Sequence, residues 1–224
     1  MKIKNLFIGK SKNYNLNNMK HLKSAYKKEI QKELYITKDG VRNDEQGDKK
    51  NHGGVDRAVC IYLENSYKFL EDKYSIKLNE CSFGENITLQ NFNDSDIYVG
   101  DIFSCGETLL EVSQPRIPCF VISYITKVEN LTKKLVEDCK TGFLLRVIKE
   151  GSVLQTDSFK LEKRVNNKFS IEYISKCYLE PQNYKNEIKE LLEEKSLADA
   201  YKEALKNRLE NSISGIEEFQ KDII

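Results

Sequence analysis

The sequence predicts a mainly β protein, a barrel or sandwich, with a small α-helical appendage at its C-terminal end. Two observations lead to this fold class. Short strand-like runs separated by turn residues fill the first three quarters of the chain, and helical periodicity replaces them afterwards. All three prolines precede residue 182, and ten of the eleven glycines precede residue 152. We therefore expect a β domain over residues 1–167 and a three-helix segment over residues 168–224.

The expected strands are short apolar or alternating runs bounded by turn residues. Because each run is too short for a typical helix, strands are the better interpretation. They are Ile3–Gly9, Glu33–Thr37, Arg57–Leu63, Glu85–Leu89, Ile97–Ser104, Thr108–Ser113, Phe143–Ile148 and Ser158–Arg164.

Two helices are expected to interrupt these strands, because apolar residues recur there at helical spacing. The first follows Asn65, and its apolar face carries Tyr67, Leu70 and Tyr74. The second carries Val128, Leu131, Leu135, Val136 and Cys139 on one face. Cys139 is therefore expected in the core.

The C-terminal segment predicts three helices from its apolar spacing. From Gln182 onward it holds seven Lys and Arg residues against ten Asp and Glu residues, which disfavours a DNA-reading module. A helical appendage packed on the barrel, or a module that binds a partner, fits this charge better. The three apolar stripes are Ile171, Ile174 and Tyr178; then Tyr184, Ile188, Leu191 and Leu192; and finally Leu197, Tyr201, Leu205 and Leu209.

Composition excludes several function classes. Apolar residues make up 39% of the chain, which is enough for a packed core, and the formal charge of +1 gives no bulk attraction to nucleic acid or an acidic membrane. The apolar run Leu6–Ile8 is far too short for a signal peptide, and no run approaches the roughly 20 residues that span a bilayer. We expect a soluble cytoplasmic protein with no nucleic-acid or membrane partner.

The six cysteines form no CxxC pair, and the two histidines cannot complete ordinary zinc spacings. In a cytosolic protein such cysteines are most often thiols in the core. Cys60, which alternates with Val59 and Ile61 in an expected strand, is assigned to the core. That interpretation suits five of the six cysteines.

The stretch KKNHGGVDRAVCIY has two interpretations. Gly53 and Gly54 permit positive φ and expose backbone N–H groups, so together with nearby cations they could cradle an anion. A solvated hairpin with a Gly-Gly turn is the alternative, and the stretch alone favours the hairpin. The four cations are Lys49, Lys50, His52 and Arg57.

Two further stretches could carry chemistry. In SFGENITL, Gly84 suggests a bend and Asn86 could bind a ligand, although turn chemistry explains both. In EVSQPRIPCFVISY, two prolines bracket Arg116 and stiffen the loop before Cys119. Arg116 could lower the pKa of the Cys119 thiol, or Cys119 could simply begin a buried apolar run. Spacing alone does not decide between these readings.

The order of the motifs is more specific than any one of them. The series NDEQGDKKNHGGVDRAVCIY, FGENITL, YVGDIFSCGETLLEVSQPRIPC and GFLLRVIKEG resembles the MOSC-domain family, and within it the YiiM type with its C-terminal helices. The resemblance extends from about residue 30 to residue 220. One departure is Asn43-Asp44, where relatives usually have Gly-Asp. Asparagine tolerates left-handed backbone geometry, so we expect the turn to survive.

The resemblance implies a MOSC-type β-barrel that binds the molybdenum cofactor, a phosphorylated pyranopterin whose dithiolene holds Mo, and not pyridoxal phosphate. It implies reduction of N-hydroxylated compounds such as 6-N-hydroxylaminopurine, a detoxification activity. Cys119 is the implied thiolate ligand of Mo. His52 and Arg116 complete the implied catalytic set, with Arg57 as the competing arginine.

Further roles follow from motif membership. His52 would deliver a proton to the leaving hydroxide, and Arg116 would stabilise negative charge or orient the substrate. Electrons would come from an external donor protein, and the resemblance leaves open a homodimer. Two other functions remain open, a non-catalytic carrier of the cofactor and a sulfur carrier with a persulfide on Cys119. The implied phosphate-binding groups are Lys50, Gly53, Gly54 and Arg57, and the implied pterin-binding groups are Asn86, Ser113 and Gln114.

Overall fold

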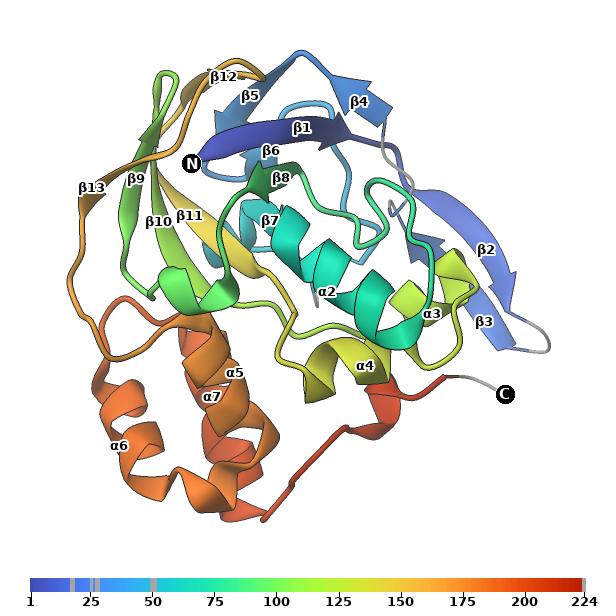
Figure 1. The fold of residues 1–224 in the computed structure, drawn as a ribbon, viewed down its shortest axis with the longest axis vertical. Helices are drawn as coiled ribbons and strands as arrows, with labels where there is room; N and C mark the ends of the chain where they lie inside the picture. The colour runs from blue at the N-terminus through green and yellow to red at the C-terminus, as the bar shows by residue number, and fades with distance from the viewer. Residues whose placement is uncertain (17–18, 25, 27–28, 49–51, 223–224) are drawn as a thin grey trace.

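One mixed sheet curls into a half-barrel and forms the body of the molecule (Figure 1). The computed structural model describes residues 1–224 except 17–18, 25, 27–28, 49–51 and 223–224. Eight strands follow the order β13 (Lys160–Lys163), β9 (Ile102–Cys105), β10 (Thr108–Pro115), β11 (Phe143–Lys149), β7 (Val59–Leu63), β8 (Ile87–Gln90), β1 (Lys2–Ile8) and β4 (Glu29–Gln31). Two small sheets accompany it, β12 (Gly151–Leu154), β5 (Glu33–Thr37) and β6 (Gly40–Val41) in one, and β2 (Lys12–Leu16) with β3 (Met19–Ser24) in the other.

The neighbouring strands are antiparallel except β7 and β8, which run parallel. A parallel pair needs a crossover connection, and α2 (Glu64–Tyr74) supplies it directly after β7. The crossover helix buries Leu70 against Tyr62 and Phe83, in a core distinct from the interior of the half-barrel. This arrangement fixes the ends of β7 and β8 beside each other.

The main core lies inside the curled sheet and follows the two-residue alternation of its strands. Val59 and Ile61 of β7 belong to it, as do Phe143 and Leu145 of β11. The residues between them therefore point to the opposite face. At the end of the sheet where β10 and β11 meet the loops, that opposite face borders a cavity.

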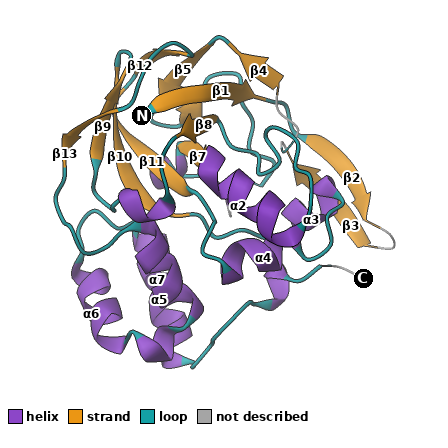
Figure 2. Ribbon diagram, viewed as in Figure 1, coloured by secondary structure: helices purple, strands orange, loops and turns teal. Residues whose placement is uncertain are grey.

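Further helices pack around the sheet (Figure 2). Two short ones, α3 (Val121–Thr126) and α4 (Leu131–Glu137), follow the Pro-rich loop. Three others, α5 (Ile171–Leu179), α6 (Lys185–Glu193) and α7 (Asp199–Glu210), lie together at one end of the sheet and share an apolar core. The backbone N–H of Ala198 donates to the carbonyl of Ser113 (3.0 Å), which joins this helical segment to β10.

The predicted fold class is confirmed, and so are the three C-terminal helices and the helix after Asn65. Some predicted bounds are wrong. Residues 97–101 form a turn and no continuous strand, because the Asp101 carboxylate accepts the backbone N–H of Tyr98 (3.0 Å) and Gly100 has a φ of +80°. The strand expected from Arg57 begins at Val59, since Val55–Arg57 is a 3-10 helix, η1.

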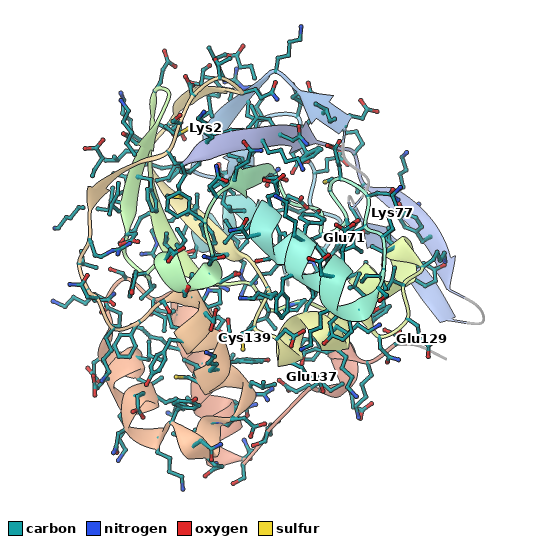
Figure 3. All side chains as sticks on the ribbon, viewed as in Figure 1. Lys2, Glu71, Lys77, Glu129, Glu137 and Cys139 are labelled. Atoms are coloured by element: carbon teal, nitrogen blue, oxygen red, sulfur yellow. The ribbon has the colours of Figure 1, made fainter. Side chains whose placement is uncertain are left out.

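Other differences are smaller. Cys139 is buried as predicted, but it follows α4 with a φ of +54° and lies beside α5 (Figure 3). The strands β2, β3, β4, β6 and β12 had no signal in the predicted pattern. Within the part of the chain that the structure describes, no helix has the length and apolar character needed to cross a membrane.

Candidate functional site

A cavity of about 530 Å³ opens where β7, β10 and β11 meet the loops at one end of the sheet. Its wall brings together residues that lie far apart in the sequence, including most of those predicted from the motifs. The loop 44–48, the turn 52–57 and the loop 116–121 form its sides. The predicted residues in its wall are His52, Arg57, Asn86, Gln114, Arg116 and Cys119.

The floor of the cavity is a row of side chains across three strands. Gln114 of β10 is in register with Leu144 of β11, and Leu144 is in register with Cys60 of β7. Residues in register on neighbouring strands share a face of the sheet, and all three line the cavity. The row continues to Asn86, whose backbone N–H donates to the carbonyl of Cys60 (2.8 Å).

Cys60 is a correction to the sequence interpretation. It was assigned to the core, yet it is only half-buried and lines the cavity. The reason is the alternation of β7, because Val59 and Ile61 occupy the core and Cys60 must face the other way. The cavity therefore contains two thiols, Cys60 and Cys119.

Gln114 leaves one polar atom without a partner in the wall. A register shift between Val112 and Gln114 turns this end of β10, and the Gln114 side chain is 1% exposed. Its Nε2 donates to the carbonyl of Pro115 (3.3 Å). Its Oε1 is buried and has no hydrogen-bond partner among the residues that the structure describes. A buried carbonyl oxygen at a cavity wall is suited to accept an N–H from a ligand.

The Asn86 side chain forms hydrogen bonds with other protein groups in the cavity wall. Its Nδ2 donates to Asp44 Oδ2 (2.8 Å) and to the carbonyl of Phe7 (3.4 Å), and its Oδ1 accepts the N–H of Cys60 (3.1 Å). Asp44 in turn accepts the N–H of Gly9 (2.8 Å). Asn43 before it adopts a φ of +66°, the left-handed geometry that asparagine tolerates.

The loop that carries Cys119 is fixed at both ends. The Arg116 N–H donates to the carbonyl of Gly142 (3.0 Å), and the Thr132 hydroxyl donates to the carbonyl of Cys119 (2.9 Å). Burial raises the pKa of the Cys119 thiol above its ordinary value, although the backbone N–H of Val121 and the charge of Arg116 favour the thiolate. Of the two alternatives that the spacing left open, the shift follows burial and not the arginine, because desolvation outweighs the charge of Arg116.

Arg116 is held by two oxygen atoms. It donates through Nη1 to the carbonyl of Phe83 and through Nη2 to the hydroxyl of Tyr26. Burial opposes its charge, yet Tyr26, Cys60, Cys119 and Glu85 raise the pKa of the guanidinium, so it stays protonated. A guanidinium has five N–H donors, so others remain for a ligand.

The ring of Tyr26 lies against the backbone of Gly84. A Cβ on that glycine would stand 3.1 Å from Tyr26 Cδ1, and the residue has a φ of +69°. Any other residue here would be strained and would push the ring aside. Burial raises the pKa of the Tyr26 phenol, and Arg116 opposes that rise, so the phenol is protonated at neutral pH.

His52 lies at the rim of the cavity. Its backbone N–H donates to the carbonyl of Asp48 (2.9 Å). Desolvation against the wall lowers the pKa of the imidazole, Arg116 lowers it further and Asp48 opposes the shift. Its side chain nevertheless remains open to water, so the neutral ring can exchange protons with solvent.

The glycine pair does not form the hairpin that the stretch alone favoured. Gly54, with a φ of +107°, precedes η1, and its carbonyl accepts the N–H of Arg57 (2.9 Å). Gly53 and Gly54 follow His52 outside the lining residues. Lys50 lies outside the described residues, so a phosphate cradle formed by Lys50, Arg57 and the two glycines stays a prediction.

Ser113 is placed behind the wall. It is fully buried, and its hydroxyl lies 2.6 Å from the carbonyl oxygen of Asp56 and 2.8 Å from that of Leu144. These contacts hold η1 against the sheet. The structure brings Gln114 to the cavity and leaves Ser113 in the support behind it.

Several cavity residues escaped the sequence analysis entirely, Tyr26 and Phe219 among them. Tyr26 comes from the region just after β3, and Phe219 comes from the far C-terminal end. Neither lies in a motif, and contacts over such distances have no local signal. For Cys60 a local signal did exist, because its alternation with Val59 and Ile61 places it on the face of β7 away from the core.

Comparisons with known proteins identify the family of the chain. The sequence matches the MOSC-domain family over residues 48–160, half of the chain, and this range includes His52, Arg116 and Cys119. The chain belongs to the MOSC-domain family. Among solved structures, this MOSC-domain protein resembles YiiM from Geobacillus stearothermophilus with a TM-score of 0.75 and 25% identity, over 93% of this chain and 98% of that one. It resembles YiiM from Escherichia coli with a TM-score of 0.73 and 22% identity, over 99% and 98%.

Curated relatives lead to the same group. YflK of Bacillus subtilis strain 168, an uncharacterized protein, is 28% identical over 88% of this chain and 89% of its own length. YiiM of E. coli K12 is 34% identical over 62% of this chain and 63% of its own length. A Gibberella moniliformis protein named Reductase is 30% identical over 66% of this chain, but only 27% of the fungal protein is covered. The chain is YiiM-like, as the motif order predicted.

Proposed function

We propose that this MOSC-domain protein is a molybdenum-cofactor-dependent oxidoreductase that reduces N-hydroxylated compounds. The observation that carries the proposal is the Cys119 thiol, which lines a cavity together with a protonated arginine, Arg116. The family is associated with the molybdenum cofactor, and one relative bears the name Reductase. These two points support the reaction class.

The residues present fit the cofactor. Cys119 offers a thiolate, the soft ligand type suited to such a metal centre, and binding a metal would release the thiol proton despite its raised pKa. Gln114 Oε1 is a buried acceptor that a pterin N–H would satisfy. The cavity volume of about 530 Å³ lies in the range of small-molecule sites. Among the described residues no group of three or more His, Cys, Asp or Glu side chains could hold a metal ion.

The reaction is a two-electron reduction. R–NHOH takes up two electrons and two protons and gives R–NH₂ and water, with cleavage of the N–O bond. When bound, the cofactor supplies the reversible two-electron centre that side chains lack. An external donor protein supplies the electrons.

The side chains around the cavity would handle protons and charge. His52 faces both the cavity and solvent, so its imidazolium form can protonate the departing hydroxyl and then recover a proton from water. Arg116, fixed by Phe83 and Tyr26, presents its remaining N–H groups to negative charge that develops on the substrate. Arg57 and Lys50 are the proposed phosphate contacts.

Cys119→Ser tests the proposal. The wild type, purified from a host that makes the cofactor, should contain molybdenum and pterin and should reduce 6-N-hydroxylaminopurine with a chemical electron donor. The serine variant should lose both while its unfolding midpoint in urea stays unchanged, because a half-buried thiol contributes little to the core. Cys177→Ser, in α5 and away from the cavity, is the control that should keep metal and activity. A Cys119→Ser protein with full metal and activity would contradict the assignment.

The same preparation separates the two other functions. A wild-type protein that binds molybdenum and pterin but reduces no hydroxylamine or amidoxime would be a cofactor carrier. A stable persulfide on Cys119 after reaction with a cysteine desulfurase would indicate sulfur transfer. Mass spectrometry of the Cys119 peptide measures that directly.

A further inference from the structure

The chain after α7 returns to the cavity. It leaves the end of the helical segment, passes beside α5 and ends next to α4 (Figure 1). On this path the Gly215 N–H donates to the carbonyl of Leu179 (2.8 Å), and residues Glu218–Gln220 form a 3-10 helix, η4. We call residues 213–222 the C-terminal strap.

A buried charge network anchors the middle of the strap. Arg208 of α7 is 1% exposed and pairs with Glu217, which also accepts the hydroxyl of Tyr178 (2.8 Å). The Arg208 guanidinium lies 4.1 Å from the centre of the Tyr178 ring. Burying a guanidinium is costly unless it is paired, so the pairing with Glu217 ties the strap to the helical core.

A second anchor joins the strap to the loop that carries Cys119. Gln220 is fully buried, and its Nε2 donates to the carbonyl of Pro118 (3.2 Å), while its Oε1 accepts the N–H of Glu217 (3.0 Å). The Phe120 N–H donates to the carbonyl of Phe219 (2.9 Å). The strap is therefore bonded to the residue before Cys119 and to the residue after it.

Phe219 is the part of this well-held segment that stays open. Its side chain is 44% exposed and lines the cavity, as does the half-buried Phe120. An aromatic ring left partly in water on a rigid backbone is a ready surface for stacking, because little ordering is needed when a flat ligand binds. Another part of the cavity wall, formed by residues 44–48 with His52 and Arg57, is mainly polar.

We propose that Phe219 is a specificity-determining residue, an aromatic platform on which a planar heteroaromatic ring of the ligand stacks. Two rings have this chemistry, the pterin of the cofactor and the ring of an aromatic N-hydroxylated substrate. The substrate half of the inference rests on the proposed function. The platform itself does not, because it concerns binding of a flat ring and no chemical step.

The test measures ring binding to metal-free protein by calorimetry, with adenine as the purine probe and a soluble pterin as the second probe. Phe219→Ala should weaken binding of at least one ring by about tenfold, because the ligand ring would lose its stacking surface. Phe219→Tyr should keep most of the affinity. Phe69→Ala is the matched control, because Phe69 of α2 is also exposed (39%) but does not line the cavity.

Each outcome is decisive. Loss of adenine binding makes Phe219 a substrate platform, and loss of pterin binding makes it a cofactor platform. If the wild type binds neither ring, or if Phe219→Ala binds both as well as the wild type, the inference is overturned. A failure of the proposed function differs from these results, because it would leave ring binding intact while no N-hydroxylated compound is turned over by the loaded enzyme.

Glu217→Gln tests the anchoring. It keeps the size of the side chain but removes the charge that pairs with Arg208, so the strap should be cut faster by a protease and the same ring should bind several-fold more weakly. Both readouts should move together, because Glu217 acts only through the position of Phe219. Unchanged ring binding with a loosened strap would overturn the positioning role.

Discussion

The cavity wall and the helical segment both contain cysteines, but in different surroundings. Cys60 and Cys119 are half-buried in the cavity wall, whereas Cys177 of α5 and Cys139 beside it are fully buried. Burial raises the pKa of Cys139 and of Cys177 to about 12. A count of cysteines does not distinguish these four thiols. What distinguishes them is whether they line the cavity or lie in a packed core. The contrast also holds for leucine and glutamine side chains, and it can be tested with each residue type.

The largest expected difference is in thiol labelling. Under native conditions iodoacetamide should modify Cys60 and Cys119 on the order of 100-fold faster than Cys139 and Cys177, because buried thiols react only through rare opening of the structure. Peptide mass spectrometry over time measures all of them in one experiment. In denaturant the rates should converge. Labelling of Cys177 at the rate of Cys119 would break the comparison.

A matched pair of leucines comes next. Leu191 of α6 is fully buried in the helical core, and Leu191→Ala should lower the free energy of unfolding by about 3 kcal/mol through the cavity it leaves. Leu144 of the cavity floor already borders open space, so Leu144→Ala should cost only roughly 1–2 kcal/mol. Urea denaturation of both variants checks the order. Equal losses would mean that the floor is packed like a core.

The smallest effects concern two buried glutamines. Gln114→Leu should change the free energy of unfolding by no more than about 1 kcal/mol, because its Oε1 has no partner to lose in the described part of the chain and its Nε2 makes one long hydrogen bond, to the neighbouring Pro115 carbonyl (3.3 Å). Gln220→Leu should cost about 1–3 kcal/mol, because it leaves the Pro118 carbonyl and the Glu217 N–H without their partner. The same denaturation measurement compares them. A larger loss at Gln114 would show that its amide supports the fold more than it serves a ligand.

Much of the fold could be predicted because its signals are local. The i, i+4 spacing of Leu197, Tyr201 and Leu205 predicts α7, and these residues are buried. The segment from Ile97 was misread because the hydrogen bond between Asp101 and Tyr98 turns the chain there, and apolar content does not reveal such a bond.

The site was predicted in part, and for a different reason. The order of the motifs identified His52, Arg116 and Cys119, and the structure gathers them at one cavity. Tyr26 and Phe219 could not be found, because only the folded chain brings them there. The direction of the Cys119 pKa shift could not be predicted either. The sequence shows that Arg116 lies three residues before Cys119, but it does not show how deeply the thiol is buried.

The row Gln114, Leu144 and Cys60 has a consequence for how this site can change. Neighbouring strands lie ~4.8 Å apart, so the distance between these positions is set by the backbone of the sheet and not by any side chain. Mutation can exchange the chemical group at each position while the distance between the positions stays constant. Ligands of other lengths must then be accommodated by the loops 44–48 and 116–121, which can lengthen or shorten without disturbing a strand. The spacing of the floor is therefore constant, and the length of the cavity is set by its loops.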